Sequence, residues 1–454
     1  MKTKALVLAA GQGTRMKSNE SKVLHKVLGK SLVEYPILAA QGVGVEEICL
    51  IVGHKAEDVE AALGDCVSYA LQKEQLGTGH AVMQALDFIE EADEVIILCG
   101  DTPLIRKKTL QVMLDFHREK QNAVTVLSTL MDDPTGYGRI VRDANGNLLK
   151  IVEQKDASEE EKKINEINGG IYTFDGKLLK YALSKLNNNN VQGEYYLTDT
   201  IEILLNEGKK VDAIAISESE DIAGVNSRMQ LAEVTKVMKK RINDKHMANG
   251  VTLIDPEHTY IEASVVIGKD TIIEPGCMLE GNTVIGEGCR IGYNSKLKNM
   301  TIKDNVDIEI SVLTDSFVDE GTHVGPFAYV RPNSHVGKNI KVGDFVEIKN
   351  STIGDGTKIS HLTYIGDADV GENVNFGCGT VVVNYDGQKK HRTTIGNHAF
   401  IGCNTNLVSP VTVEDNAYTA AGSTITKTVP KDSLAIARAR QENKENWVLK
   451  KRQK

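Results

Sequence analysis

The chain lacks the features that mark secreted, membrane-spanning or nucleic-acid-binding proteins. Its seven cysteines are scattered without a Cys-x-x-Cys pair, which favours neither a disulfide framework nor a zinc site. No apolar run could span a bilayer, and the first one, near the N-terminus, is too short for the core of a signal peptide. The net charge of −9 argues against general binding to nucleic acids or membrane surfaces. We therefore expect a cytoplasmic protein with no nucleic-acid partner and no membrane insertion.

The most informative feature present is an aliphatic residue at every sixth position of the C-terminal half. Such a period fits neither an amphipathic helix nor an alternating strand, but it is typical of a parallel β-helix, in which glycines and other small residues turn the corners. The period slips near Thr301 and Val370, and an insertion at 384–394 interrupts it. The repeated residues are Ile261, Ile267, Ile273, Leu279, Ile285, Ile291 and Leu297; Val318, Val324, Val330, Val336, Val342 and Ile348; and Ile395, Ile401, Leu407 and Val413.

The N-terminal half shows a different pattern, in which short apolar strands alternate with helical segments. Its strands are predicted at 5–8, 48–52, 95–98 and 123–127, which indicates an α/β domain with a mainly parallel sheet. With 454 residues, the chain is too long for one core. We predict an α/β domain at 1–225, a linker helix at 226–250, a β-helix at 251–437 and a basic arm at 438–454.

A glycine-rich turn follows the first predicted strand. In the segment Leu8 to Met16, glycines let backbone N–H groups approach phosphate oxygens at the start of a helix. Met16 stands where a dinucleotide-binding motif needs its third glycine, and the Gly-Lys-Ser/Thr of a P-loop is missing. Gly-x-Gly by itself is also common in plain tight turns.

The longer string Leu-x-x-Gly-x-Gly-Thr-Arg-Met, followed by Lys22, resembles the signature of sugar-1-phosphate nucleotidyltransferases. The resemblance implies that Arg15 and Lys22 neutralise charge on the α-phosphate during attack. It also implies Mg²⁺ held by Asp101 and Asn226, although both residues could instead cap helices. The implied UDP-sugar-binding residues are Leu8, Ala9, Ala10, Gly11, Gly13, Lys22, Gln72, Gly77, Thr78, Gly138, Glu153, Asn168 and Asn226.

Polar residues interrupt the hexad pattern in one part of the β-helix. His361 lies in a predicted strand, and cationic and amide side chains such as Arg331, Lys349 and Asn375 lie within two coils of it. A histidine in a strand is most often structural, and a β-helix can be a scaffold alone. The cluster nevertheless favours a pocket in which a neutral imidazole takes a proton from an attacking amine.

Together, these motifs resemble the bacterial family of bifunctional N-acetylglucosamine-1-phosphate uridylyltransferases and glucosamine-1-phosphate acetyltransferases, in the family's order along the whole chain. The resemblance implies a left-handed β-helix, a homotrimer, Mg²⁺, and acetyl-CoA and UTP as co-substrates. It makes His361 the base for acetyl transfer. It places the amino-sugar phosphate at Arg331, Lys349, Tyr364 and Asn375, and acetyl-CoA at Cys378, Asn384, Tyr385, Cys403, Ala421 and Arg438.

Two cysteines depart from this pattern, because some relatives carry Ala and Ser where this chain has Cys378 and Cys403. The change puts side-chain hydrogen bonding at 403 in doubt. A thiol there would also make acetyl transfer sensitive to alkylation.

The expected function is acetylation of glucosamine-1-phosphate on the β-helix, followed by uridylyl transfer from UTP to N-acetylglucosamine-1-phosphate in the N-terminal domain. One alternative is a nucleotidyltransferase with a single activity, whose β-helix serves oligomerisation or regulation. Another is a non-enzymatic regulatory subunit. His361 and the insertion at 384–394 argue against the first, and the presence of Arg15, Lys22, Asp101 and Asn226 argues against the second.

Overall fold

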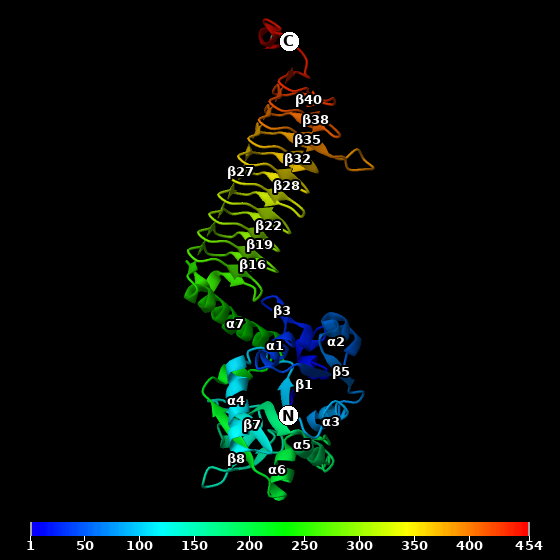
Figure 1. Ribbon diagram of the computed structural model, residues 1–454, viewed down its shortest axis with the longest axis vertical. Helices are drawn as coiled ribbons and strands as arrows, with labels where there is room; N and C mark the ends of the chain where they lie inside the picture. Colours follow the sequence, from blue (N-terminus) through cyan, green and yellow to red (C-terminus); the bar gives the residue numbers. More distant parts are fainter. Residues whose placement is uncertain (1, 453–454) are drawn as a thin grey trace. The chain divides into compact units, whose positions relative to one another are not determined.

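The computed structural model describes residues 2–452, which form two compact units divided between Met238 and Lys239 (Figure 1). Helix α7 (Arg228–Ala248) crosses this boundary, in the segment predicted as a linker helix. Its second half packs on the start of the β-helix, where the Asn243 amide donates to the carbonyl oxygens of Pro256 (2.8 Å) and Thr259 (3.1 Å).

The first unit contains a nine-stranded sheet with the order β11-β7-β10-β6-β1-β4-β5, to which β8 and β9 add a hairpin. The predicted parallel arrangement holds for β6, β1, β4 and β5 and for the β7–β11 pair. Strand β10 runs antiparallel to both of its neighbours, so the sheet is mixed. The strands are β1 (Thr3–Ala9), β4 (Glu47–Val52), β5 (Ser68–Leu71), β6 (Glu94–Cys99), β7 (Val124–Leu130), β8 (Arg139–Arg142), β9 (Leu148–Val152), β10 (Glu166–Asp175) and β11 (Val211–Ile216).

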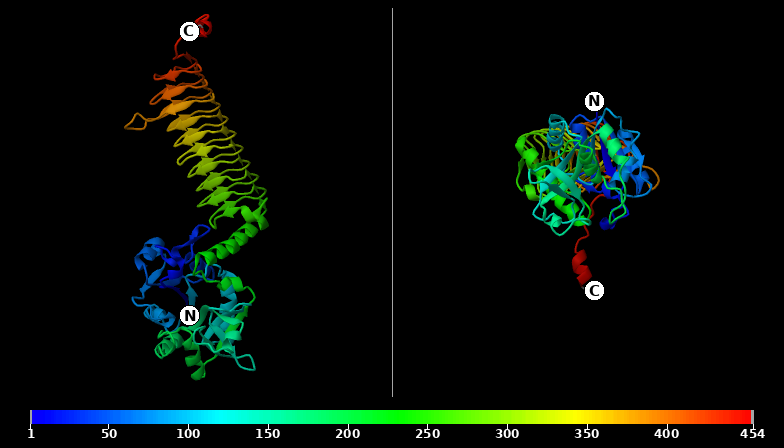
Figure 2. Two further views of the ribbon diagram at one scale, coloured as in Figure 1. Left: turned by 180° about the vertical axis from the view of Figure 1, so that it is seen from behind. Right: turned by 90° about the horizontal axis from the view of Figure 1, so that it is seen from below.

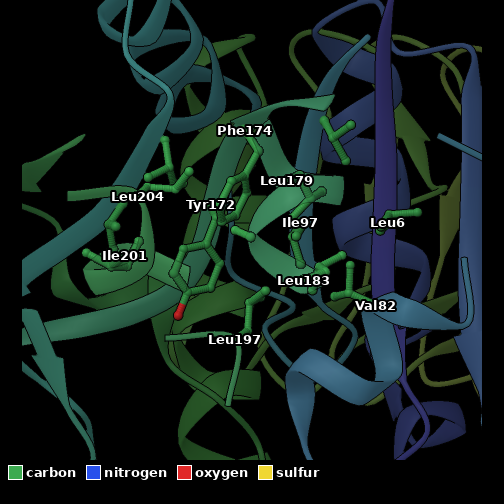
Figure 3. Packing of buried hydrophobic residues seen from close by; sticks show 14 of the residues in the cluster. Leu6, Val82, Ile97, Tyr172, Phe174, Leu179, Leu183, Leu197, Ile201 and Leu204 are labelled. Atoms are coloured by element: carbon green, nitrogen blue, oxygen red, sulfur yellow. The ribbon is translucent and has the colours of Figure 1, made fainter. Parts of the chain in front are cut away.

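Helices cover both faces of this sheet, which explains why its strands are continuously apolar in sequence. Alternate residues of β1 enter opposite cores: Leu6 lies in one cluster, and Ala5 and Val7 lie in the other. In the cluster shown in Figure 3, sheet residues such as Tyr172 and Phe174 pack against side chains from α5 and α6. The helices are α1 (Glu34–Gly42), α2 (Ala56–Leu63), α3 (Thr78–Met83), α4 (Lys107–Lys120), α5 (Gly176–Leu183) and α6 (Asp199–Asn206).

The second unit is a three-sided parallel β-helix, as the six-residue period predicted. Its three sheets contain 11, 10 and 9 strands, and successive coils stack from β12 (Thr252–Leu253) to β41 (Leu434–Ala435). The repeated aliphatic residues point inward; Ile273, Leu279 and Ile285 are at most 1% exposed. Each buried side chain of this kind contributes about 1.5–3 kcal/mol to stability. The short helix α8 (Trp447–Arg452) follows this unit.

The coils are unequal in length where the sequence period slips. Thr301 pairs with Phe317, whereas Ala368 pairs with Thr393, across the predicted insertion. The insertion protrudes from the stack as a loop beside β35 (Thr393–Ile395), coloured orange in Figures 1 and 2.

One corner of the prism is built by alternating glycine and asparagine. In the column Gly288, Asn305, Gly321, Asn339, Gly356 and Asn373, every residue has a positive φ between 52° and 68°. Glycine and asparagine adopt this conformation at the least cost. The Asn373 Oδ1 lies only 2.5 Å from where a Cβ on Gly356 would be, so the asparagine side chain occupies the space beside the glycine of the preceding coil.

Candidate active sites

The first candidate site is a cavity of about 310 Å³ at the carboxyl ends of β1 and β6. Ligands of open α/β sheets bind at this edge. Residues predicted to bind nucleotide, sugar or metal supply most of the lining: Leu8, Ala9, Ala10, Gly11, Lys22, Gln72, Gly77, Thr78 and Asp101. The lining also includes Val23, Gln75, Ala81, Cys99 and Glu194.

Lys22, Asp101 and Asn226 meet at the floor of this site. The Lys22 ammonium lies 2.5 Å from an Asp101 carboxylate oxygen and 3.0 Å from the Asn226 amide oxygen. The backbone N–H of Val225 donates to the Asp101 carbonyl oxygen (2.9 Å), which fixes the Asn226 segment beside β6. Two oxygen ligands therefore already converge on one cation, and such oxygens are those that Mg²⁺ prefers.

The rest of a magnesium shell would come from phosphates and water. Within residues 2–452, no group of three or more His, Cys, Asp or Glu side chains is placed to hold a metal. Magnesium usually binds to one or two carboxylates together with substrate phosphates, so the residues present fit this ion.

The glycine-rich turn packs directly on Lys22. Gly13 has a φ of +62°, and a Cβ at this position would lie 2.6 Å from the Lys22 Cβ. Glycine is therefore required there for both conformation and space. Arg15, in the 3-10 helix Thr14–Met16, is solvent-exposed and lies outside the cavity lining.

The loop that contains the predicted UDP-sugar-binding residues Gln72, Gly77 and Thr78 is fixed by Gln72, which is 3% exposed. The Gln72 side-chain amide donates to the Gly77 carbonyl oxygen (3.1 Å) and lies 3.1 Å from the His80 Nδ1. The Tyr195 carbonyl oxygen lies 2.5 Å from where a Cβ on Gly77 would be, so the 187–197 loop closes tightly over this turn.

Three predicted sugar-binding residues form a neighbouring cluster. The Asn168 N–H donates to the Gly138 carbonyl oxygen (2.9 Å), and a Cβ on Gly138 would lie 3.6 Å from a Glu153 carboxylate oxygen. The Thr198 hydroxyl donates to Glu153 (3.3 Å), and burial raises the pKa of this carboxyl. The adjacent Leu197 N–H donates to the Thr78 hydroxyl (3.1 Å), which links this cluster to the lining of the cavity.

The second candidate site lies along one corner of the β-helix. Asp344, at the end of β27 (Lys341–Asp344), pairs with His361, at the end of β30 (Lys358–His361). The same register continues through β33 (Asn375–Phe376), β36 (Phe400–Ile401) and β39 (Tyr418–Thr419). One continuous column therefore contains, coil by coil, Asp344, His361, Cys378, Cys403 and Ala421.

Asp344 contacts the predicted base directly. The His361 Nδ1 lies 2.8 Å from an Asp344 carboxylate oxygen. This hydrogen bond holds the pKa of Asp344 below its usual value. Both side chains are accessible to solvent, with exposures of 58% for His361 and 40% for Asp344.

The predicted phosphate-binding residues project from the neighbouring face. Arg331 pairs with Glu347 (2.7 Å), and Lys349 lies 3.4 Å from Asp367. The buried Asn384 amide donates to the same Asp367 carboxylate (2.5 Å) and to the Tyr364 hydroxyl (3.4 Å). Asn384 is therefore already engaged in holding this network together.

A second lysine stands beside Lys349. Lys390, from the protruding loop, has its pKa lowered chiefly by the contact with Lys349. Arg331 lowers it further. A cluster of cationic side chains at this position suits a dianion such as a phosphate.

The remaining predicted residues lie around this column. Asn375 points outward from the sheet that contains β30, rather than from the face of Lys349. The Arg438 Cδ lies 3.7 Å from where a Cβ on Gly422 would be, next to Ala421. Tyr385 is 55% exposed in the protruding loop, where its hydroxyl donates to the Gly387 carbonyl oxygen (2.7 Å).

Sequence reasoning missed Asp344, Glu347, Asp367 and Lys390. Asp344 could have been found only by counting residues between unequal coils, since its partner His361 lies in the next coil. Lys390 could have been found from the cluster of basic residues in the insertion.

Comparisons with known proteins agree with this architecture. The family described as "Nucleotidyl transferase" matches residues 4–236. The family described as "Bacterial transferase hexapeptide (six repeats)" matches residues 264–299 and 392–427. The fold and its two sites therefore define a nucleotidyltransferase joined to a hexapeptide-repeat transferase.

Full-length relatives specify the family. The bifunctional protein GlmU of Acetivibrio thermocellus is 57% identical over 98% of this chain and 97% of its own length. The proteins of that name from Clostridioides difficile and Clostridium acetobutylicum are 55% and 58% identical, over 100% and 98% of this chain and 99% and 98% of their own lengths. The chain belongs to the family of the bifunctional protein GlmU.

Proposed function

We propose that this chain makes UDP-N-acetylglucosamine from glucosamine-1-phosphate, acetyl-CoA and UTP in two steps on two separate sites. The observation that carries the proposal is the presence in one chain of both domains, each with its polar site, at 55–58% identity to bifunctional relatives over essentially the whole length. The nucleotidyltransferase with a single activity is the less favoured reading, because it leaves the polar column at His361 without a role.

Acetyl transfer takes place at the column that contains His361. The His361 Nε2 accepts a proton from the 2-amino group of glucosamine-1-phosphate as its nitrogen attacks the thioester carbon. The C–S bond then breaks, and the proton passes to the CoA sulfur. Arg331, Lys349 and Lys390 bind the sugar phosphate, while Tyr364 and Asn375 orient the sugar.

Acetyl-CoA lies farther along the same column. The backbones at Cys378, Cys403 and Ala421 line its path, and Asn384 and Tyr385 hold the acetyl end. Arg438 meets the phosphorylated adenosine. This placement is supported by the column's continuous register from His361 to Ala421 and by the position of Arg438 over Gly422.

Uridylyl transfer takes place in the cavity of the first unit. The phosphate of N-acetylglucosamine-1-phosphate attacks the α-phosphorus of UTP in line, and pyrophosphate leaves. Arg15 and Lys22 neutralise the negative charge that accumulates on the α-phosphate. Gln72, Gly77 and Thr78 hold the uracil ring, while Gly138, Glu153 and Asn168 hold the sugar. The backbone from Leu8 to Gly13 approaches the phosphates.

Asp101 and Asn226 are the residues that would hold Mg²⁺. When bound, this ion would supply positive charge that offsets the negative charge of the phosphates. The Lys22 ammonium contacts both of these residues in the structure, so it would compete with the metal ion for them.

We also propose that the chain is a homotrimer assembled through the β-helix. An exposed apolar ladder at one corner supports this: Phe327, Phe345 and Leu362 are 53–57% exposed and have left-handed φ values of 42–57°. Bulky side chains in this strained conformation are uncommon outside functional surfaces. The Phe327 and Phe345 rings stack at 5.4 Å. Sedimentation equilibrium is expected to give three times the mass of the chain.

A cytoplasmic location is supported by the seven cysteines, all of which are free in the structure. Unpaired thiols are typical of reducing compartments. No helix among residues 2–452 is both long and apolar enough to cross a membrane.

One assay tests both activities. Purified protein receives glucosamine-1-phosphate, acetyl-CoA, UTP and Mg²⁺, and thiol release and pyrophosphate release are followed separately. Both signals are expected, and His361→Ala should abolish thiol release while pyrophosphate release from added N-acetylglucosamine-1-phosphate persists. Pyrophosphate release without any thiol release from the unmodified protein would reduce the β-helix to a scaffold.

A further inference from the structure

We propose that Asp344 is a positioning residue for acetyl transfer, which holds His361 in the tautomer that leaves Nε2 free to accept the proton. This inference rests on the proposed role of His361 as the base. Asp344 does not touch the substrate; it acts through the imidazole.

The contact follows from the way in which two coils stack. Strands β27 and β30 are hydrogen-bonded neighbours, and Asp344 and His361 occupy the same position in successive coils. Neighbouring strands lie about 4.8 Å apart, so equivalent side chains on them can meet. Gly343 permits the close approach, because a Cβ there would lie 1.9 Å from the Ser360 carbonyl oxygen. The resulting distance from the His361 Nδ1 to the Asp344 carboxylate is 2.8 Å.

The hydrogen bond between Asp344 and His361 determines which ring nitrogen of the neutral imidazole carries the proton. An ionised carboxylate can only accept hydrogen bonds, so the imidazole nitrogen facing it must be the donor. His361 therefore carries its ring proton on Nδ1, and the lone pair lies on Nε2. As Nε2 takes up a proton from the amine, the negative charge of Asp344 stabilises the imidazolium that forms. Asp344 itself stays ionised throughout.

Few other ionisable groups face this pair. From the next coil the Cys378 thiol follows His361 in the column. Lys341, on the same strand as Asp344, acts on the carboxylate and lowers its pKa slightly. Lys358 is the first residue of β30, the strand that ends at His361, and its side chain is exposed. Asp344 is thus the one carboxylate bonded to His361 among residues 2–452.

The experiment compares Asp344→Asn and Asp344→Ala with a matched control, Asp307→Asn. Asp307 and His323 are likewise equivalent residues of adjacent coils, with the His323 Nδ1 3.4 Å from the carboxylate, but they lie outside the proposed site. Acetyl transfer is measured as kcat and KM for both substrates from pH 5.5 to 9. Uridylyl transfer in the same samples reports correct folding.

Both Asp344 variants are expected to lower kcat by about 10- to 100-fold, less than for a fully buried pair, because this pair is partly solvated. Both KM values should stay within about twofold of the unmodified protein's, since orientation of a base affects the chemical step. The dependence of kcat on pH should also change in both variants, because Asp344 no longer offsets the charge of the imidazolium that forms during the reaction. Asp307→Asn should leave all three quantities unchanged.

Two results would overturn the proposal about Asp344 alone. One is an unchanged kcat and pH profile in both variants; the other is a rise in KM with no fall in kcat, which would make Asp344 a binding residue. Loss of acetyl transfer in His361→Ala remains the separate test of the base. If His361→Ala kept full acetyl transfer, the assignment of the base would fail, and the role of Asp344 would fail with it.

Discussion

At the scale of single residues, both candidate sites are defined by contacts between charged and polar side chains. In the first site a lysine ammonium is held between a carboxylate and an amide oxygen. In the second, a carboxylate holds one nitrogen of an imidazole, and two lysines stand side by side. A ligand or a proton that binds at either site would change these contacts.

The first prediction concerns Lys22 as a competitor of the metal. Because its ammonium occupies the position between Asp101 and Asn226, Lys22→Ala should strengthen the binding of Mn²⁺ without nucleotide by about 3- to 10-fold. The same variant should slow uridylyl transfer by at least about 100-fold, because the charge on the α-phosphate is no longer neutralised. Calorimetric titration of Mn²⁺ measures the first effect. The exposed Lys26 provides the control, since Lys26→Ala should change neither quantity; weaker metal binding in Lys22→Ala would contradict the prediction.

The second prediction concerns the exposed thiol of Cys403 in the proposed acetyl-CoA path. Iodoacetamide should abolish acetyl transfer and spare uridylyl transfer, because the added group blocks the path. Cys403→Ser should protect acetyl transfer. Cys66, the other exposed cysteine, lies in the first unit, so Cys66→Ser should give no protection. Acetyl transfer that survives alkylation in the unmodified protein would rule the idea out.

At the scale of secondary-structure elements, local sequence sets the type of element, and packing sets its neighbours. Helix α6 shows that packing can bury an ionisable side chain at a cost in stability. Its first residue, Asp199, lies near Glu202 and Asp156, and burial raises its pKa from 3.8 to about 6, followed by smaller effects of these two carboxylates. The helix N-terminus favours a negative charge there, but desolvation outweighs this effect.

The third prediction follows from this raised pKa. The protonated form of Asp199 is favoured in the folded state, so its contribution to stability is complete below about pH 4 and is lost as the pH rises through about 6. Asp199→Asn cannot ionise and should therefore raise the Tm of the first unit at pH 7.5 by about 2–4 °C, which corresponds to about 1 kcal/mol after screening by solvent.

The pH dependence provides the check on this prediction. Calorimetry at pH 4 should show almost no difference between Asp199→Asn and the unmodified protein. The exposed Asp132 is the control, since Asp132→Asn should leave the Tm unchanged at both pH values. A lower Tm for Asp199→Asn at pH 7.5 would show that the helix N-terminus, rather than desolvation, dominates.

At the scale of the whole molecule, the chain consists of two units with separate cores and separate sites. Each unit should therefore respond to its own ligands. At 100 times its Kd, a ligand stabilises the unit that binds it by about 2.7 kcal/mol, which for a unit of this size corresponds to about 5–10 °C in Tm.

The fourth prediction is that the two units respond independently. UTP with Mg²⁺ should raise only the transition of the first unit, and acetyl-CoA only that of the β-helix, in calorimetry of the full chain. Asp101→Ala serves to assign the transitions, because it should remove the response to UTP with Mg²⁺ and leave the response to acetyl-CoA. A single transition that moves with both ligands would show that the units unfold together.

Much of this architecture was predictable from the sequence. The β-helix is visible in the six-residue period because each coil contacts only its neighbours, so a local pattern specifies the whole stack. The glycine-rich turn was placed correctly after the first strand, because an apolar run that ends in glycines is typical of a buried strand followed by a tight turn. The antiparallel β10 was not foreseen, since an apolar strand buried on both faces has no sequence signal for its direction.

The sequence by itself therefore determined the two domain types and singled out the candidate site residues, because period, turn chemistry and motif spacing act over short distances. Only the tertiary structure decided which of these residues meet. Asp344 contacts His361, and Lys390 contacts Lys349, because coils of unequal length come into register through hydrogen bonds between strands. Lys22 reaches Asn226 because β6 and the segment before α7 are joined at Asp101. Pairings of this kind depend on strand register and chain crossing, which no local pattern encodes.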